Sequence, residues 1–577
     1  MLNSTSTTLR GPFSLLVGRM SLVRRPTLAR NGRAFADSSK STKDEDSGSQ
    51  TTIHPTHSNP KATPGAVNSQ KPDFDLMVIG SGPAAQACAI SSSRRGKKVA
   101  VIDKPGMLGG VCVNTGTIPS KTFREAVLHL TGYRHQGFYG KSYAPAGRIS
   151  MEGILHRVSM VVKGEKDVMR NRFRQYGISH IYGTAHFTGE EKTVQVTSVA
   201  VEEEERKRKR AVGTAGAGLE VEPFSKPFTT EKALVAVGTT PARRADFDFD
   251  GVHIIDSDDL LSGSLQRVPR ELIVVGAGVI GMEYASMFNV IPGTRVTVID
   301  GRPDVLTFAD KEIIQSLEYE MRQKGARFLL GEEVLNARVE GDHVVANMAS
   351  GKVLRGDCLL YTVGRQGNTA GLGLDKAGVE VSKRGLMTVN DNYQTSVPWL
   401  YAAGDCIGFP ALASTSSQQG RMAAHHMWGG NEGDALKAFG GFPYGIYTIP
   451  EISMVGYTEQ QLTQQKIPYE MGVARYDELA KGQMMGGSSG MLKVLFHAET
   501  LKILGVHCMG ESATEIVHVG QVAMDMGMDM HFLTENVFNY PTFAESYRVA
   551  AFNGLKRLAL AGYTDVSQHQ HEGAASP

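Results

Sequence analysis

The stretch FDLMVIGSGPAA, residues 74–85, decides the fold of this 577-residue chain. A short apolar run ends at Gly80 and Gly82 and continues through Ala85 into a helix-like segment, and a second apolar run ends on the acid Asp103. Glycines at these positions allow a tight turn and a close approach of a pyrophosphate, the helix N-terminus supplies N–H groups, and the acid accepts hydrogen bonds from ribose hydroxyls. The pattern predicts a Rossmann-like dinucleotide-binding domain.

The same pattern occurs a second time in the chain. The apolar run ELIVV, residues 271–275, leads into Gly276, Gly278 and Gly281, and a following run ends on Asp300. A fortuitous glycine turn would not bring the strand, the helix and the acid with it, so we predict a second dinucleotide site. The fold class expected is therefore α/β.

The segment GGVCVNTGTIPSK, residues 109–121, resembles the redox-active segment of the flavin disulfide reductases, which reads roughly GGxCxNxGCxPSK. The first cysteine of that pattern is present as Cys112, but Thr117 replaces the second. Thiol–disulfide exchange requires a thiolate that attacks a sulfur, and a threonine hydroxyl cannot take either part. The sequence therefore retains the other residues of this family's redox-active segment but cannot form its disulfide.

A second part of the thiol chemistry is also absent. The family closes with a segment like HxHPTxxE, whose histidine before the proline is the acid/base for the substrate thiol, whereas this chain reads FNYPT at residues 538–542, followed by Glu545. Tyr540 stands in place of the histidine, and a phenol titrates near pH 10, far from the pKa that an efficient acid/base needs at neutral pH. We interpret the activity as flavin chemistry without a sulfur substrate.

Two further segments, ALVAVG at 233–238 and LYAAGD at 400–405, occur in the order that the family shows, so the resemblance covers residues 73–563. It implies two Rossmann-like domains followed by an α+β dimerisation domain. The expected boundaries are 73–266 and 387–440 for the two parts of an FAD-binding domain, 267–386 for an NAD(P)-binding domain, 441–563 for dimerisation, and 564–577 for a disordered tail.

The resemblance also implies the residues of the site. In this family, the residues that match Lys121 and Glu283 form an ion pair beside the flavin and the nicotinamide, where the lysine stabilises the reduced flavin and the glutamate orients the lysine; we expect these two to be the catalytic pair. The residues expected to bind FAD and the nicotinamide dinucleotides are Gly80, Gly82, Ala85, Asp103, Gly110, Cys112, Thr117, Gly238, Gly276, Gly278, Gly281, Asp300, Arg302, Gly364, Gly404 and Asp405.

Within the family, the chain is most similar to the soluble NAD(P) transhydrogenases, in the segments GTIPSK, YTIPEIS (447–453) and FNYPT. That resemblance implies that NADPH reduces FAD and that NAD⁺ then collects the hydride at the same site. Asp300 suits the 2′-hydroxyl of NAD, and Arg302 could pair with the 2′-phosphate of NADP, although an arginine that simply faces the solvent is equally consistent with the sequence.

Other functions remain to be compared with this one. A flavin diaphorase that reduces a quinone or another acceptor is the alternative, since reduced flavin reacts with many acceptors. A disulfide reductase would need both of the missing residues. A redox-inactive scaffold that keeps FAD for folding would not need Lys121, Glu283 or an intact second dinucleotide site.

The N-terminal region is expected to be a targeting segment. Residues 1–36 contain six arginines and no acid, which is typical of an organellar transit peptide, and the stretch up to residue 72 reads as a disordered linker. The location expected from this is the mitochondrial matrix, with a plastid as the alternative. A merely disordered basic tail is the other interpretation. Removal of these arginines from a formal net charge of +2 leaves −4, which gives no indication of a nucleic-acid partner.

The remaining features indicate no metal and no membrane span. The five cysteines are widely scattered, His569 and His571 lie in the expected tail, and no apolar run approaches the roughly 18 residues of a membrane helix. We expect no metal, no membrane association and a homodimer. Residues 199–220 contain an acidic run that adjoins a basic run, followed by a Gly/Ala-rich run; they are too polar for a core, and we expect a solvated loop there.

Overall fold

The computed structural model describes residues 71–139, 149–198, 224–429, 441–486 and 489–562. The expected targeting segment and linker, the charged segment 199–220 and the two C-terminal histidines all lie outside the described residues. The strands on either side of the charged segment, β4 (Thr193–Ser198) and β5 (Ser225–Val235), pair antiparallel with one another.

The first sheet is built around β1 (Phe74–Ile79), which pairs in parallel with β2 (Val99–Asp103) and β5. β3 (Ser179–Phe187) continues the sheet beside β2, β16 (Leu400–Ala402) continues it beside β5, and β4 joins β3 and β5 antiparallel. The helices of this part are α1 (Pro83–Ser93), α2 (Gly110–Asn114), α3 (Thr117–Thr131), α4 (Tyr133–Tyr139), α5 (Met151–Gln175) and α10 (Ala413–Met427).

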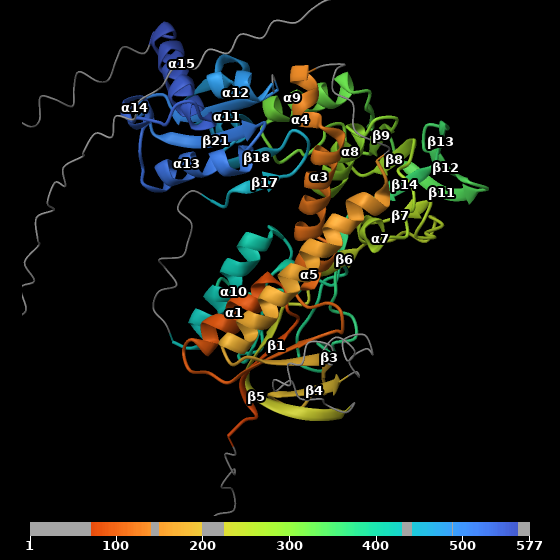
Figure 1. The fold of residues 1–577 in the computed structure, drawn as a ribbon. Helices are drawn as coiled ribbons and strands as arrows, with labels where there is room; N and C mark the ends of the chain where they lie inside the picture. The colour runs from red at the N-terminus through yellow and green to blue at the C-terminus, as the bar shows by residue number, and fades with distance from the viewer. Residues whose placement is uncertain (1–70, 140–148, 199–223, 430–440, 487–488, 563–577) are drawn as a thin grey trace, which may run out of the picture. The chain divides into compact units, whose positions relative to one another are not determined.

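Helices α1 and α10 lie side by side against this sheet (Figure 1). Their close approach depends on Gly420, because a Cβ at this residue would lie 2.1 Å from the carbonyl oxygen of Ala84. The helix α1 begins with a proline at its first turn, where the missing N–H has no intrahelical partner to lose, and its residues Ala84, Ala85 and Ala89 are buried.

The second sheet is entirely parallel, in the order β10 (Arg327–Leu330), β9 (Arg295–Asp300), β8 (Glu271–Val275), β14 (Cys358–Tyr361) and β7 (Ile254–Ile255). Its helices are α7 (Ser257–Ser262), α8 (Val279–Asn289) and α9 (Lys311–Gln323). An antiparallel sheet accompanies it, formed by β11 (Val334–Glu340), β12 (His343–Met348) and β13 (Val353–Gly356).

Two packing contacts cross the expected bounds of the second domain, 267–386. β7 precedes residue 267, yet it pairs with β14 of the second sheet. Leu372 and Leu374 precede residue 386, yet they pack into the hydrophobic cluster of the first sheet. A strand as short as β7 carries too little sequence pattern to be recognised, and the expected boundaries stay predictions. Between the two domains, β6 (Thr239–Pro241) pairs with β15 (Arg365–Gly367).

The C-terminal part is an α+β domain with an antiparallel sheet in the order β17 (Tyr444–Ile446), β18 (Ile452–Gly456), β21 (Ile503–Met509), β20 (Met491–His497) and β19 (Tyr469–Arg475). Its helices are α11 (Glu459–Gln465), α12 (Ala480–Met485), α13 (Ala513–Asp525), α14 (Met530–Glu535) and α15 (Ser546–Leu560). The α/β fold with two Rossmann-like domains and a C-terminal α+β domain is thus confirmed.

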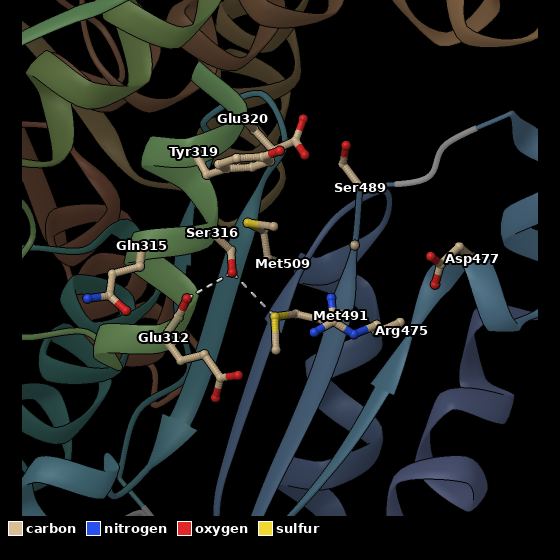
Figure 2. A pocket seen from close by; sticks show the side chains of 11 residues that line it. Glu312, Gln315, Ser316, Tyr319, Glu320, Arg475, Asp477, Ser489, Met491 and Met509 are labelled. Atoms are coloured by element: carbon tan, nitrogen blue, oxygen red, sulfur yellow. Dashed lines mark hydrogen bonds between the residues drawn. The ribbon is translucent and has the colours of Figure 1, made fainter. Parts of the chain in front are cut away.

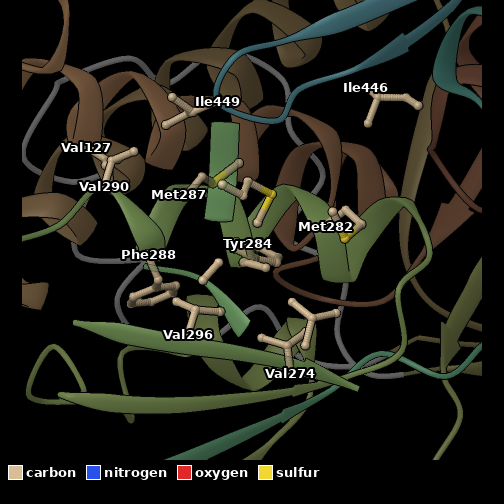
Figure 3. Packing of buried hydrophobic residues seen from close by; sticks show 14 of the residues in the cluster. Val127, Val274, Met282, Tyr284, Met287, Phe288, Val290, Val296, Ile446 and Ile449 are labelled. Atoms are coloured by element: carbon tan, nitrogen blue, oxygen red, sulfur yellow. The ribbon is translucent and has the colours of Figure 1, made fainter. Parts of the chain in front are cut away.

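One continuous hydrophobic cluster connects the three parts (Figure 3). Phe123 of α3 packs against Tyr284 and Phe288 of α8, with ring centroids 5.9 and 5.7 Å apart, and Ile446 and Ile449 of the C-terminal part belong to the same cluster. Because burial of apolar surface is the dominant favourable contribution to folding, this cluster holds α3 and α8 in a fixed relation to the C-terminal sheet.

A cavity of about 310 Å³ lies between α9 and the strands β19, β20 and β21 (Figure 2). At its floor, the Ser316 hydroxyl donates to the Glu312 carbonyl oxygen at 2.9 Å and contacts the Met491 sulfur at 3.7 Å. None of the residues expected to bind a cofactor lines this cavity.

A buried lysine joins α9 to the C-terminal sheet. The Lys493 side chain on β20 is fully buried, and its ammonium lies 3.0 Å from Asp310 and 2.9 Å from Glu312, both at the start of α9, and also contacts Glu459 at the start of α11. Burial raises the pKa of Asp310, but His507 and Lys493 outweigh it and bring that pKa below its ordinary value.

These three carboxylates are the one group among the described residues whose oxygens lie close enough to hold a metal ion together. The Lys493 ammonium already lies among them and offsets part of their charge. The absence of a metal centre stays a prediction. Among the described residues, no helix has the length and hydropathy to cross a bilayer.

Replacement of Lys493 with methionine should destabilise the protein strongly, because it leaves the buried Asp310 carboxylate without its cation. Loss of one partner of a buried ion pair costs about 3–5 kcal/mol, which urea unfolding can measure. The matched control is Lys556→Met, since Lys556 is exposed on α15. Equal unfolding midpoints for the two variants would contradict a stabilising role for Lys493.

Candidate functional site: two dinucleotide turns and a shared ion pair

The two predicted fingerprints form the same turn. The Gly80 N–H donates to the Ile102 carbonyl oxygen and the Gly276 N–H donates to the Ile299 carbonyl oxygen, both at 2.8 Å. Gly80 and Gly276 have φ values of 100° and 105°, which residues with a Cβ rarely adopt. A Cβ on Gly80 would also lie 2.3 Å from a backbone oxygen of the neighbouring strand connection.

The next glycine of each turn faces open space. A Cβ at Gly82 or at Gly278 would meet nothing within 4 Å, and each residue is the N-cap of the following helix, α1 or α8. An unobstructed backbone at a helix N-terminus is the environment that a pyrophosphate requires. Ala85 is buried in α1, and Gly281 is required in α8 because a Cβ there would lie 1.9 Å from the Gly276 oxygen.

Asp103 at the end of β2 is held by the turn itself. Its carboxylate accepts hydrogen bonds from the Ser81 hydroxyl and, at 2.7 Å, from the Lys104 N–H, and the same Ser81 hydroxyl accepts from the Gly109 N–H at 2.8 Å. Burial outweighs these hydrogen bonds and raises the pKa of Asp103 to about 6. Ser81 thereby connects the first turn to residues 109–121, which resemble the redox-active segment of the family but lack its second cysteine and are called here the degenerate redox segment.

The degenerate redox segment lies directly on the first turn. Gly110 packs so closely against Gly82 that a Cβ on Gly110 would lie 3.1 Å from the Gly82 Cα. Cys112 lies in α2, and Thr117 begins α3. Burial raises the pKa of the Cys112 thiol more than its hydrogen bond with Thr117 lowers it, so this cysteine is a protonated thiol at neutral pH.

Lys121 and Glu283 meet, although 162 residues separate them. The Lys121 Nζ donates to both carboxylate oxygens of Glu283, at 2.9 and 2.7 Å. The Glu283 side chain is only 5% exposed, whereas the Lys121 side chain is 26% exposed, so the lysine is the member of the pair that faces accessible space. The contact joins α3 of the first domain to α8 of the second.

A segment of the C-terminal domain completes this pair. The Tyr447 N–H donates to Glu283 Oε1 at 2.9 Å, and the Lys121 Nζ lies 4.9 Å from the centre of the Tyr447 ring. Next along the chain, the Thr448 carbonyl oxygen accepts from Arg124 Nε at 3.0 Å. Sequence reasoning assigned no role to Arg124. A buried arginine requires a partner nearby, but the burial of Arg124 is visible only in the structure.

Asp405 is placed by Gly404 at the start of a short helical turn, and the Gly404 N–H donates to the Gln419 side chain at 2.8 Å. Burial raises the pKa of Asp405 despite the nearby Arg365 and hydrogen bonds with Ser416 and Thr239. Gly238, which precedes Thr239, and Gly364, which precedes Arg365, have φ values of 65° and 87° at the connections between the domains.

Arg365 was also missed by sequence reasoning. It donates from Nε to the Thr239 hydroxyl at 2.8 Å, and its guanidinium lies 3.7 Å from Asp258 of α7. It therefore links both domains near Asp405, and only the pairing of β6 with β15 brings these residues together.

The end of β9 differs from the end of β2 in its charge. The Asp300 carboxylate accepts from the Ala277 N–H at 2.7 Å, from Arg302 Nε at 2.9 Å and from Arg302 Nη2 at 2.7 Å. Burial raises the pKa of Asp300, but the Arg302 hydrogen bonds outweigh it and the pKa lies below its ordinary value. Asp300 is therefore a carboxylate that already forms an ion pair, with the neighbouring Arg302.

Comparison with protein families gives two matches in the order of the structure. Residues 74–420 match the model described as pyridine nucleotide-disulphide oxidoreductase, and residues 442–551 match the dimerisation domain of the same family. The chain is also similar in structure to LpdA of Mycobacterium tuberculosis, with a TM-score of 0.70, 24% identity, and coverage of 83% of this chain and 99% of that one. At that identity, the likeness shows the fold alone.

The sequence relatives are more similar. The soluble pyridine nucleotide transhydrogenases of Mycobacterium bovis BCG Pasteur and Mycobacterium tuberculosis H37Ra are each 45% identical over 486 residues, which covers 84% of this chain and 98% of each relative. The soluble pyridine nucleotide transhydrogenase of Klebsiella pneumoniae is 41% identical, with coverage of 84% and 99%.

These relatives correct one expectation. The predicted mitochondrial location, with a plastid as the alternative, is wrong, because the relatives are proteins of bacteria, which have neither organelle. The transit peptide inferred within residues 1–72 has no support from them either. A basic, Ser-rich composition is shared by targeting segments and by disordered tails, so composition alone cannot distinguish the two.

The two family models match successive parts of this chain, and the first of them covers more than half of it. The transhydrogenase relatives are matched over almost their whole length. The same membership confirms the expected flavin and nicotinamide cofactors, FAD, NAD and NADP. This chain belongs to the pyridine nucleotide-disulphide oxidoreductase family, with the transhydrogenase likeness that its sequence indicated.

Proposed function

We propose that this protein transfers a hydride from NADPH to NAD⁺, with bound FAD as the carrier. The observation that supports this best is the intact Lys121–Glu283 pair beside a segment in which Thr117 replaces a redox cysteine. NADPH loses a hydride and becomes NADP⁺, and NAD⁺ gains it and becomes NADH, so the reaction balances without a thiol couple or another reductant. The relatives named soluble pyridine nucleotide transhydrogenase agree with this assignment.

The first domain fits FAD by its chemistry. The open backbone at Gly82 would receive the pyrophosphate, and the buried carboxyls of Asp103 and Asp405 would accept hydrogen bonds from hydroxyls of the ribose and of the flavin side chain. Gly110, Cys112, Thr117, Gly238 and Gly404 lie along the same path. When bound, FAD supplies the ring that accepts a hydride and passes it on.

The chain's own residues supply charge and orientation. Lys121 offers a partly exposed positive charge, which favours an electron-rich ring beside it, and Glu283 holds that ammonium with both carboxylate oxygens. Because Glu283 is buried, its carboxylate has little freedom to turn toward other hydrogen-bond donors. We assign Lys121 the electrostatic role and Glu283 the role of orienting Lys121.

The second turn, formed by Gly276, Gly278 and Gly281, would bind either nicotinamide dinucleotide in succession. Asp300 suits the 2′-hydroxyl of NAD, and Arg302 can turn from Asp300 toward the 2′-phosphate of NADP. The Arg302 side chain is 51% exposed, so this movement requires no repacking. The Asp300–Arg302 pair would thereby accommodate both substrates.

The protein is further proposed to act as a homodimer, since residues 442–551 match a dimerisation domain. A flavin diaphorase that reduces a quinone is the second candidate. The named relatives do not favour it, but the assay below distinguishes the two.

The FAD-loaded protein, mixed with NADPH in a stopped-flow instrument, should lose its oxidised flavin absorbance and recover it when NAD⁺ is added. NADH should accumulate in equal amount to the NADPH consumed. Rapid reoxidation by a quinone but none by NAD⁺ at any concentration would assign the protein to the diaphorases instead.

Arg302→Ala should lower kcat/KM for NADPH about 10- to 100-fold and leave that for NADH almost unchanged, because a charge-assisted contact to phosphate is lost. Asp300→Asn should shift the preference mildly toward NADPH, since it removes a repulsive charge. Steady-state kinetics with both nucleotides measures this. Equal losses for NADPH and NADH in Arg302→Ala would instead show a general structural role.

Binding of FAD to the apoprotein should strengthen as the pH rises through about 6. Asp103, with a pKa of about 6, accepts ribose hydrogen bonds best as the carboxylate, so the affinity at pH 5 should be about tenfold below its plateau. Titration by flavin fluorescence gives the profile, and Asp103→Asn should flatten it. An unchanged profile in that variant would mean that another group titrates.

A further inference from the structure

Tyr447 lies where the three parts of the molecule meet, and neither its ring nor its backbone has an assigned role. The backbone N–H contacts Glu283 Oε1 at 2.9 Å, and the ring centre lies 4.9 Å from the Lys121 Nζ. A single residue of the C-terminal domain thus contacts both members of the ion pair.

We propose that Tyr447 is a positioning residue, whose ring and backbone amide together fix the Lys121 ammonium on the Glu283 carboxylate. The proposal rests on the function assigned above to this pair. It implies that the C-terminal domain takes a direct part in the hydride-transfer site, in addition to its part in dimerisation.

The backbone around Tyr447 is fastened to both partner helices. The Tyr447 N–H reaches Glu283 of α8, and the Ile449 N–H donates to Ser286 Oγ, also of α8, at 3.0 Å. Between them, the Thr448 carbonyl oxygen accepts from Arg124 of α3. Three consecutive residues therefore bond alternately to the two helices that carry Glu283 and Lys121.

The ring of Tyr447 is fixed from its own domain. Gly445 lies beside the ring, since a Cβ on Gly445 would be in ordinary contact with the ring atom Cε2, at 3.4 Å. Burial raises the pKa of the Tyr447 phenol above its ordinary value, although a hydrogen bond with the Thr514 side chain acts in the opposite direction. The phenol is thus neutral at pH 7 and is a weaker acid than an ordinary tyrosine. We therefore assign the effect of this side chain on Lys121 to the electron-rich face of its ring.

A cation over an aromatic face is stabilised by the ring quadrupole, and the effect grows as water is excluded. The Lys121 side chain is 26% exposed, so water reaches the group that the Tyr447 ring contacts only in part. A lysine has four flexible bonds, and two oxygens of one carboxylate fix its ammonium on one side only. The ring restricts it from a second direction.

The test compares Tyr447→Leu, which removes the aromatic face, with Tyr447→Phe, which keeps it and removes the hydroxyl. Both are measured as FAD-loaded protein. Tyr447→Leu should slow the reduction of the flavin by NADPH about tenfold, make the flavin midpoint potential more negative, and leave the dissociation constant of NADPH within about twofold. Tyr447→Phe should match the wild type in all three, and so should Tyr457→Leu, a change at a half-exposed tyrosine of the same domain.

A double-mutant cycle shows whether Tyr447 acts through Lys121. In a Lys121→Met background, Tyr447→Leu should have almost no further effect on the potential or on the rate, because the cation that the ring positions is already absent. If Tyr447→Leu does not accumulate as a folded flavoprotein, Tyr447→Met provides the same comparison.

The proposal is overturned if Tyr447→Leu retains the wild-type potential and reduction rate, if Tyr447→Phe is impaired as strongly as Tyr447→Leu, or if the effects of Tyr447→Leu and Lys121→Met simply add. These outcomes are separate from failure of the proposed function. Flavin reduction by NADPH and the flavin potential can be measured even if NAD⁺ proves not to be the acceptor.

Discussion

The buried carboxylate of Glu283 is the constraint on which the arrangement of the other parts depends. The Glu283 side chain is 5% exposed, and a carboxylate buried to this extent is stable only if its lone pairs are occupied by donors. Here the donors come from two other parts of the chain, Lys121 from α3 and the Tyr447 N–H from the C-terminal domain. The two Rossmann-like domains and the C-terminal domain must therefore assemble together before this site exists, and the hydrophobic cluster around Phe123 and Ile449 stabilises the same junction.

The two dinucleotide turns are nearly identical in their backbone, and they differ in electrostatics. Gly80 and Gly276 share a φ close to 100° and the same hydrogen bond to the adjoining strand. At the ends of those strands, burial raises the pKa of Asp103, whereas at Asp300 burial is outweighed by the hydrogen bonds from Arg302 and Ala277 together, which lower the pKa. One local structure thus places two carboxylates in different environments: at Asp103 burial has the larger effect, and Asp300 is paired with Arg302.

The contact at Lys493 has the opposite charge arrangement to the contact at Glu283. There a buried ammonium is surrounded by Asp310, Glu312 and Glu459, whereas at the site a buried carboxylate is surrounded by donors. Both junctions lie between the NAD(P)-binding part and the C-terminal part, through α9 in one case and α8 in the other. Polar contacts of this kind contribute little net stability but penalise other arrangements, because a misplaced domain would leave a charge buried and unpaired.

The sequence by itself determined the two glycine turns, the α/β class, the loss of the second cysteine at Thr117 and the identity of the Lys121–Glu283 pair, because these depend on local pattern or on a motif with fixed spacing. The domain boundaries at 267 and 386 stay predictions, and composition alone led to the wrong location. Only the tertiary structure decided that Tyr447 and Arg124 join the site, that Arg302 rests on Asp300 and that Lys493 lies among three carboxylates. These contacts depend on the direction of each side chain and on how the domains pack against one another. The spacing of residue types along the chain does not specify either of these.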